Sequence, residues 1–116
     1  MTLIQNTETA AFDGQNVEVL TISGTLWVRA DQIGAPLGLA NPGRAVRKIY
    51  QRHRSEFMDD MSIVVEVPAR GGPQLTRLFS PRGASLIAML ARSPKAAEFR
   101  AWVLDVLEAR PAPAAD

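Results

Sequence analysis

The sequence predicts a single α+β domain with two small β-hairpins, a helix pair resembling a helix-turn-helix, and two C-terminal helices. Three observations support this class. The chain has 116 residues, the length of one domain. Two pairs of short β-prone runs are each joined by a turn that contains Gly. In the C-terminal third, Ser80-Pro81 and Ser93-Pro94 are helix-start signals that precede apolar residues.

The N-terminal third is expected to hold the first hairpin. Residues 1–11 are mostly polar and show no regular pattern, so we expect a flexible N-terminus followed by a domain over 12–109. Residues 17–22 and 26–29 are β-prone, and Ser23-Gly24 between them is a turn signal. These residues predict two strands in antiparallel pairing.

A pair of helices is expected next. Asp31 is a suitable N-cap for a short helix, and Pro36 limits that helix to about two turns. Asn41 as N-cap and Pro42 at the first helical position start a second helix, expected over 42–53. Its inward face has apolar residues at helical spacing: Val46, Ile49 and Tyr50.

The rest of the chain predicts a second hairpin and two helices. Residues 62–67 and 74–79 are strand candidates on either side of a loop rich in Gly and Pro. Helices are expected over 81–91 and 94–109, each after a Ser-Pro cap. Residues 110–116 are rich in Pro and Ala and are expected to form a tail or linker.

Composition excludes several classes of function. The chain has no Cys and a single His, His53, so disulfides, thiol catalysis and Cys- or His-rich metal sites are not expected. Glu56, Asp59 and Asp60 have no second ligand cluster and are expected to form a solvated loop. No nucleophile–base pair or carboxylate pair is suggested by spacing, so we expect no enzyme, cofactor or metal. No apolar run spans a membrane and no signal peptide is apparent, so a cytoplasmic protein is expected.

Positive charge is concentrated in one short stretch. The net charge of the whole chain is only +1. Residues 44–54 nevertheless contain no acidic residue and carry five cations: Arg44, Arg47, Lys48, Arg52 and Arg54. On a helix, residues three and four apart are neighbours, so most of these cations form a stripe opposite the apolar face.

This stripe predicts a DNA-binding helix. Cations release the counterions of DNA, and a helix fits the major groove. Arg44 and Arg47 in the first turns are expected to reach base edges, as are Asn41 and Gln51. The remaining cations of the helix and of the second hairpin are expected to contact phosphates: Lys48, Arg52, Arg54, Arg70 and Arg77. The alternative is an ordinary amphipathic surface helix whose basic face is solvated.

Three segments resemble the BRO-family amino-terminal (Bro-N) domain of phage antirepressor-type proteins. The first is Phe12-Asp13-Gly14 together with 27–34, and the second is 37–42 with the helix after it. The third, residues 79–87 continuing into 92–103, contains the most specific motif. The resemblance implies a DNA-binding module of viruses and prophages, and hence a transcriptional regulator in a bacterial host cell. An antirepressor that binds a repressor protein instead of DNA is the alternative.

The C-terminal helices carry more apolar residues than one face needs. We expect one set to fill the core: Ile87, Leu90, Phe99, Trp102 and Val103. A second set remains for a partner: Leu86, Met89, Leu104 and Leu107. Small regulators commonly bind DNA as two-fold dimers, so we expect a homodimer joined through these helices.

Overall fold

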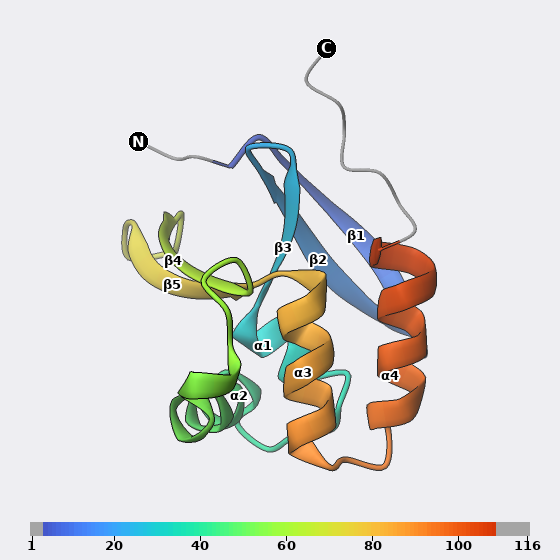
Figure 1. The fold of residues 1–116 in the computed structure, drawn as a ribbon. Helices are drawn as coiled ribbons and strands as arrows, with labels where there is room; N and C mark the ends of the chain where they lie inside the picture. The colour runs from blue at the N-terminus through green and yellow to red at the C-terminus, as the bar shows by residue number, and fades with distance from the viewer. Residues whose placement is uncertain (1–3, 109–116) are drawn as a thin grey trace.

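The fold is seen in a computed structural model, which describes residues 4–108 (Figure 1). Within these residues, the strands form one five-stranded antiparallel sheet in the order β1-β2-β3-β5-β4. The strands are β1 (Asn6–Phe12), β2 (Gln15–Ile22), β3 (Thr25–Arg29), β4 (Ser62–Val67) and β5 (Gln74–Phe79). The helices are α1 (Ala30–Gly34), α2 (Pro42–Arg52), α3 (Pro81–Ala91) and α4 (Ala96–Trp102), with a 3-10 turn η1 (Arg54–Glu56) and a π-helix η2 (Val103–Glu108). The α+β class is confirmed.

The expectation of an irregular N-terminus is wrong for β1. This strand pairs with β2 over its whole length, from Asn6 opposite Thr21 to Phe12 opposite Gln15. The turn between them has only two residues, Asp13 and Gly14, with φ of 50° and 78°. Two consecutive left-handed residues match the right-handed twist of a hairpin, so the chain reverses directly into β2.

The two expected hairpins form and are joined in one sheet. Ser23 and Gly24, again both left-handed, connect β2 to β3, and β4 pairs with β5 along all six residues. A short antiparallel contact then unites the halves, with Val28 opposite Phe79 and Arg29 opposite Leu78.

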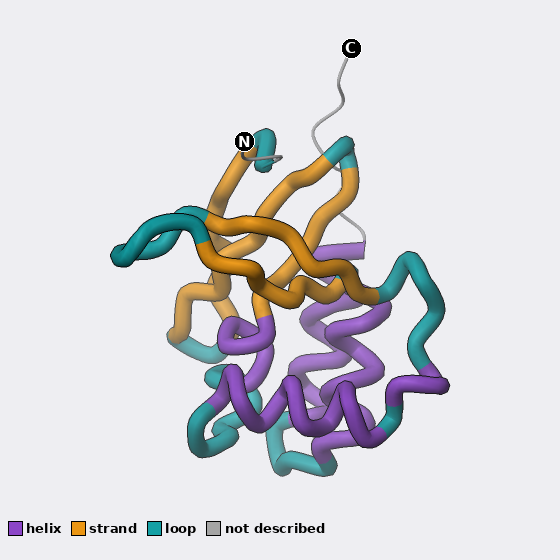
Figure 2. The backbone as a smooth tube through the Cα atoms, turned by 90° about the vertical axis from the view of Figure 1, so that its left-hand side faces the viewer, coloured by secondary structure: helices purple, strands orange, loops and turns teal. Residues whose placement is uncertain are grey.

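The helices cover one face of this sheet (Figures 1 and 2). Apolar residues of β1, β2, β3 and β5 form a core with the helices, in which Val28, Phe79, Ile87 and Phe99 are fully buried. The opposite face has a smaller apolar cluster made largely by the strands: Leu20, Ile22, Trp27 and Leu78, with Ile4, Ile63 and Val65 packed against it. Period-two alternation explains both clusters, since successive strand residues point to opposite faces.

The N-terminal caps of α1 and α2 differ from those that the sequence predicts. Helix α1 begins at Ala30 with Arg29 as N-cap, so Asp31 lies inside the first turn and is not the cap. Asn41 is the N-cap of α2 as expected, but its backbone is left-handed (φ 49°) and its side chain makes no capping bond.

Helix α3 begins directly after Ser80 as expected, whereas α4 begins later than expected after Ser93. The Ser80 hydroxyl accepts a hydrogen bond from the Gly83 N–H at 3.1 Å, which caps α3 as expected. Ser93 Oγ accepts from the Lys95 N–H at 3.1 Å, and α4 begins only at Ala96, not at residue 94. The expected single helix over 94–109 is an α-helix followed by η2, and residues 109–116, including the expected tail, lie outside the described residues.

Burial corrects part of the expected partner surface. Leu107 is 1% exposed and belongs to the core, so it is not available to a partner. Met89 and Leu104 are 50% and 58% exposed, as a partner surface requires. In residues 4–108 no helix is long and apolar enough to cross a membrane.

Candidate nucleic-acid interface

Helix α2 has one apolar and one basic face. Val46 is fully buried, and Ile49 and Tyr50 pack against the main core. The helix begins as the sequence indicates, with Pro42 in its first turn. This packing turns the opposite side of α2 toward solvent, which leaves the residues between the apolar positions exposed.

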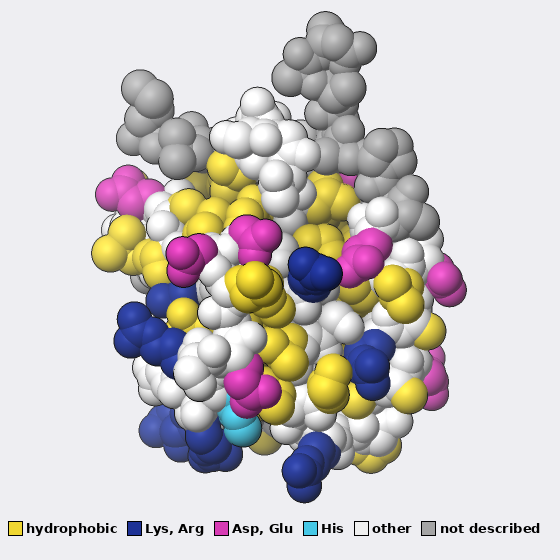
Figure 3. Space-filling model, viewed as in Figure 1, with side chains coloured by type: hydrophobic (Ala, Val, Ile, Leu, Met, Phe, Trp, Pro, Cys, Tyr) yellow, Lys and Arg dark blue, Asp and Glu magenta, His cyan; other side chains and the backbone are white. Residues whose placement is uncertain are grey.

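The predicted DNA-binding residues of this segment are all exposed: Asn41, Arg44, Arg47, Lys48, Gln51, Arg52 and Arg54. Arg54 lies just beyond α2, in η1. Within residues 4–108, no carboxylate forms an ion pair with any of the five cations in this set. Figure 3 shows the dark blue side chains gathered at the lower left, over α2. Their charge is therefore available to an external anion.

Helices α1 and α2 are in close contact at a glycine. A Cβ on Gly34 would lie 2.5 Å from the carbonyl oxygen of Pro42, closer than a side chain allows. The first turn of α2 therefore rests directly on the backbone of α1. This contact fixes how α2, and with it the basic face, projects from the domain.

The C-terminal end of α2 is closed by a local side-chain contact. His53 is the C-cap, and its Nδ1 lies 2.8 Å from Glu56 Oε2. The ring is half-buried at the end of the helix.

The two hairpin arginines have different surroundings. Arg70 lies in the exposed loop between β4 and β5. Arg77, in β5, donates from Nη1 to Ser62 Oγ at 2.7 Å, and its guanidinium lies 4.2 Å from the centre of the Tyr50 ring. Arg77 therefore holds the β4–β5 hairpin against α2, a contact that the sequence pattern does not indicate.

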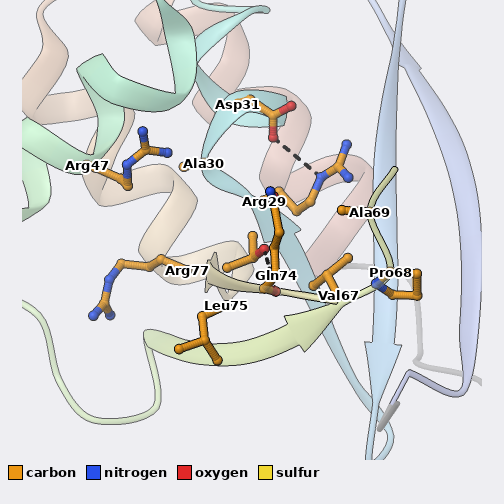
Figure 4. A pocket seen from close by; sticks show the side chains of 11 residues that line it. Arg29, Ala30, Asp31, Arg47, Val67, Pro68, Ala69, Gln74, Leu75 and Arg77 are labelled. Atoms are coloured by element: carbon orange, nitrogen blue, oxygen red, sulfur yellow. Dashed lines mark hydrogen bonds and ion pairs between the residues drawn. The ribbon is translucent and has the colours of Figure 1, made fainter. Parts of the chain in front are cut away.

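A hollow of about 320 Å³ separates the hairpin from the helix pair (Figure 4). It is lined on one side by Arg47 and on the other by hairpin residues 67–69 and 74–77. In Figure 4 the Arg77 guanidinium points away from Arg29 and Asp31. Arg70 does not line this hollow, so the structure does not bring all of the predicted residues together in one place.

Arg29 lines the same hollow and is absent from the predicted set. Its Nε lies 3.4 Å from Asp31 Oδ1 and its Nη1 lies 3.6 Å from Glu18 Oε1. The sequence signal for this ion pair is the opposite charge of Arg29 and Asp31, which are two residues apart in the chain. Because two carboxylates compensate its charge, Arg29 adds little to the positive potential of the α2 face.

Comparison with known families identifies the domain. The profile described as BRO family, N-terminal domain, matches residues 16–109, which is most of the chain. No curated protein and no solved structure matches the chain. The resemblance drawn from the sequence is confirmed: the chain belongs to the BRO family, and residues 16–109 match the N-terminal domain of that family.

Proposed function

We propose that this domain is a sequence-specific transcriptional regulator of phage or prophage type that binds double-stranded DNA through α2. Its family supports this, because BRO-family N-terminal domains are generally DNA-binding. Such a regulator acts in the cytoplasm of the bacterial host cell. We propose no catalytic residue and no cofactor for it.

The observation that carries the proposal is the set of five cations on and just after α2 that have no ion-pair partner among residues 4–108. An 11-residue helix is about 16 Å long, and a rod of this kind fits a major groove about 12 Å wide. Arg44 and Arg47 lie in the first half of α2, the part from which a recognition helix usually contacts bases. Asn41, whose amide makes no capping bond, lies at the same end.

Phosphate contacts are assigned to the rest of the basic surface. Lys48, Arg52 and Arg54 follow along the helix and into η1, and Gln51 lies exposed among them. Arg70 in the exposed loop is suited to a flanking phosphate. Arg77, which is held by Tyr50 and Ser62, supports the surface by fixing the hairpin against α2.

A salt titration tests the proposal. If about four phosphates are neutralised, the logarithm of the association constant falls against the logarithm of salt concentration with a slope of roughly −4. Changing Arg47 and Lys48 together to Ala removes one base contact and one phosphate contact, so binding should weaken strongly and the slope should flatten to roughly −3. Binding is followed by fluorescence anisotropy of a labelled duplex.

Arg100→Ala is the matched control, because Arg100 is an exposed cation on α4, away from α2. Its slope should equal that of the parent. If the double variant of Arg47 and Lys48 keeps the parental slope, α2 is not part of the DNA interface.

The second candidate is an antirepressor that binds a repressor protein. The half-exposed Met89 and Leu104 favour it, because they give the C-terminal helices an apolar surface. Under this alternative, the parent protein binds no duplex even at low salt. It would instead bind the repressor in a way that Met89→Lys abolishes.

A further inference from the structure

The two edges of the sheet are protected to different extents. At the β1 edge, the indole Nε1 of Trp102 donates to the carbonyl oxygen of Ala11 at 2.8 Å, so α4 covers part of this strand. At the other edge, no strand of residues 4–108 pairs with the outer side of β4. An open edge offers unpaired N–H and C=O groups to another strand.

β4 lacks the features that usually keep an edge strand from pairing. Its sequence, Ser-Ile-Val-Val-Glu-Val, has no Lys, no Pro and a single charge, Glu66. Within residues 4–108, the Glu66 carboxylate has no ion-pair partner. The strand is therefore β-prone, apolar and able to accept a neighbour.

Apolar side chains are exposed on the same hairpin. Val64 of β4 is 48% exposed and Leu75 of β5 is 76% exposed. Figure 3 shows apolar side chains at the left edge of the molecule, over the β4–β5 hairpin. Exposure of this kind beside an open edge is typical of an interaction surface.

We propose that β4 pairs antiparallel with β4 of a second copy of this chain, so that two sheets become one continuous sheet. The register that we infer places Val64 opposite the partner's Val64. Ile63 then faces the partner's Val65, which extends the small apolar cluster of Leu20, Ile22, Trp27 and Leu78 across the two-fold axis.

Charge complementarity selects this register and this occupant. It places Glu66 opposite the partner's Ser62. In each copy, Ser62 Oγ accepts a hydrogen bond from the Arg77 guanidinium, so a cation lies beside the site that Glu66 enters. The two-fold axis repeats the pair, and two Glu66–Arg77 contacts flank the central valines. If the two-fold axis lay at Glu66 instead of Val64, which shifts the pairing by four residues, the two Glu66 carboxylates would face each other and repel.

The same register determines where the two α2 helices lie in the dimer. Val64 and Arg77 lie opposite each other on the sheet face that carries α2, since Arg77 contacts Tyr50. Two copies related through Val64 therefore present both α2 helices on one face of the joined sheet. This is the arrangement that a regulator needs for two inverted half-sites on DNA.

Sedimentation equilibrium of the full chain without DNA tests the interface, so that its failure is separate from any failure of DNA binding. We expect the parent to change from monomer to dimer as the protein concentration rises from micromolar to tenths of millimolar. Val64→Lys brings two cations face to face and Glu66→Lys places a cation near Arg77, so each should raise the dimer dissociation constant roughly tenfold or more. Circular dichroism shows whether each variant keeps the parental fold.

Leu104→Lys is the matched control, because Leu104 is an apolar residue on the C-terminal helices that is at least as exposed as Val64. It should leave the dimer intact. The proposal is overturned by a parent that stays monomeric, by β4 variants that dimerise like the parent, or by loss of the dimer in Leu104→Lys alone, which would place the interface on the C-terminal helices.

Discussion

The guanidinium of Arg77 stacks on the ring of Tyr50, with 4.2 Å between the guanidinium carbon and the ring centre. Tyr50 also packs edge-on against Phe57 and Phe79, at centroid distances of 5.0 and 5.7 Å. One residue of β5 thus joins the hairpin to the helix that carries the basic surface. The contact connects the two parts of the proposed DNA interface.

Arg77→Ala should therefore lower the free energy of unfolding. The variant loses a cation–π contact and a hydrogen bond to Ser62, together worth roughly 1–2 kcal/mol. Arg70→Ala, in the exposed loop, should stay within about 0.5 kcal/mol of the parent. Urea unfolding measures both variants. If Arg77→Ala unfolds like the parent but binds DNA more weakly, Arg77 contacts phosphate and does not support the fold.

Trp102 is expected to contribute through both packing and one hydrogen bond. Its ring is half-buried and lies 5.6 Å from Phe12 and 5.5 Å from Phe99. Because the ring is not fully buried, Trp102→Ala should cost about 3 kcal/mol, the lower end for a large aromatic residue. Trp102→Phe keeps a ring but loses the bond to Ala11, and should cost about 1 kcal/mol. Equal losses in the two variants would show that the hydrogen bond dominates.

Local signals explain most of the fold that the sequence predicted. Ser80-Pro81, Pro42 and Ser23-Gly24 act within a few residues, so helix starts and the turn between β2 and β3 could be recognised. β1 was missed because its own residues are mostly polar. Its signal was the dipeptide Asp13-Gly14, which is typical of a two-residue hairpin.

Other features depend on contacts between distant segments. The pairing of Val28 with Phe79 joins the hairpins, and nothing near either residue indicates it. The exposed face of α2 was predictable because its cations lie within one helix. The contact between Arg77 and Tyr50 could not be predicted. Alternation along β5 indicates which face of the sheet Arg77 lies on, but not which helix its side chain contacts there.

Arg44 is expected to contribute to sequence discrimination more than to general affinity. It is exposed in the first turn of α2, where a bidentate contact to guanine is possible. Once a preferred duplex has been selected, Arg44→Ala should reduce its preference over a scrambled duplex by roughly 1–3 kcal/mol. Lys48→Ala should weaken binding to both duplexes about equally. Competition binding at fixed salt measures the two ratios, and equal discrimination in Arg44→Ala and parent would exclude base contact by Arg44.

The last prediction concerns the contact that orients α2. A Cβ on Gly34 would meet the carbonyl oxygen of Pro42 at 2.5 Å and its Cβ at 2.7 Å, and neither atom belongs to a flexible side chain. Gly34→Ala must therefore push α2 away from α1, at a cost of roughly 1–3 kcal/mol. Gly43→Ala is the matched control, because its nearest neighbour is the mobile end of Arg47 at 3.2 Å. Alanine also favours a helix over glycine, so this variant should be neutral or more stable by up to about 1 kcal/mol. Thermal unfolding and the salt titration are measured on both variants, and we expect only Gly34→Ala to lose stability and DNA affinity together. If Gly34→Ala is destabilised but binds DNA like the parent, the approach of α1 to α2 supports the fold without orienting the basic face.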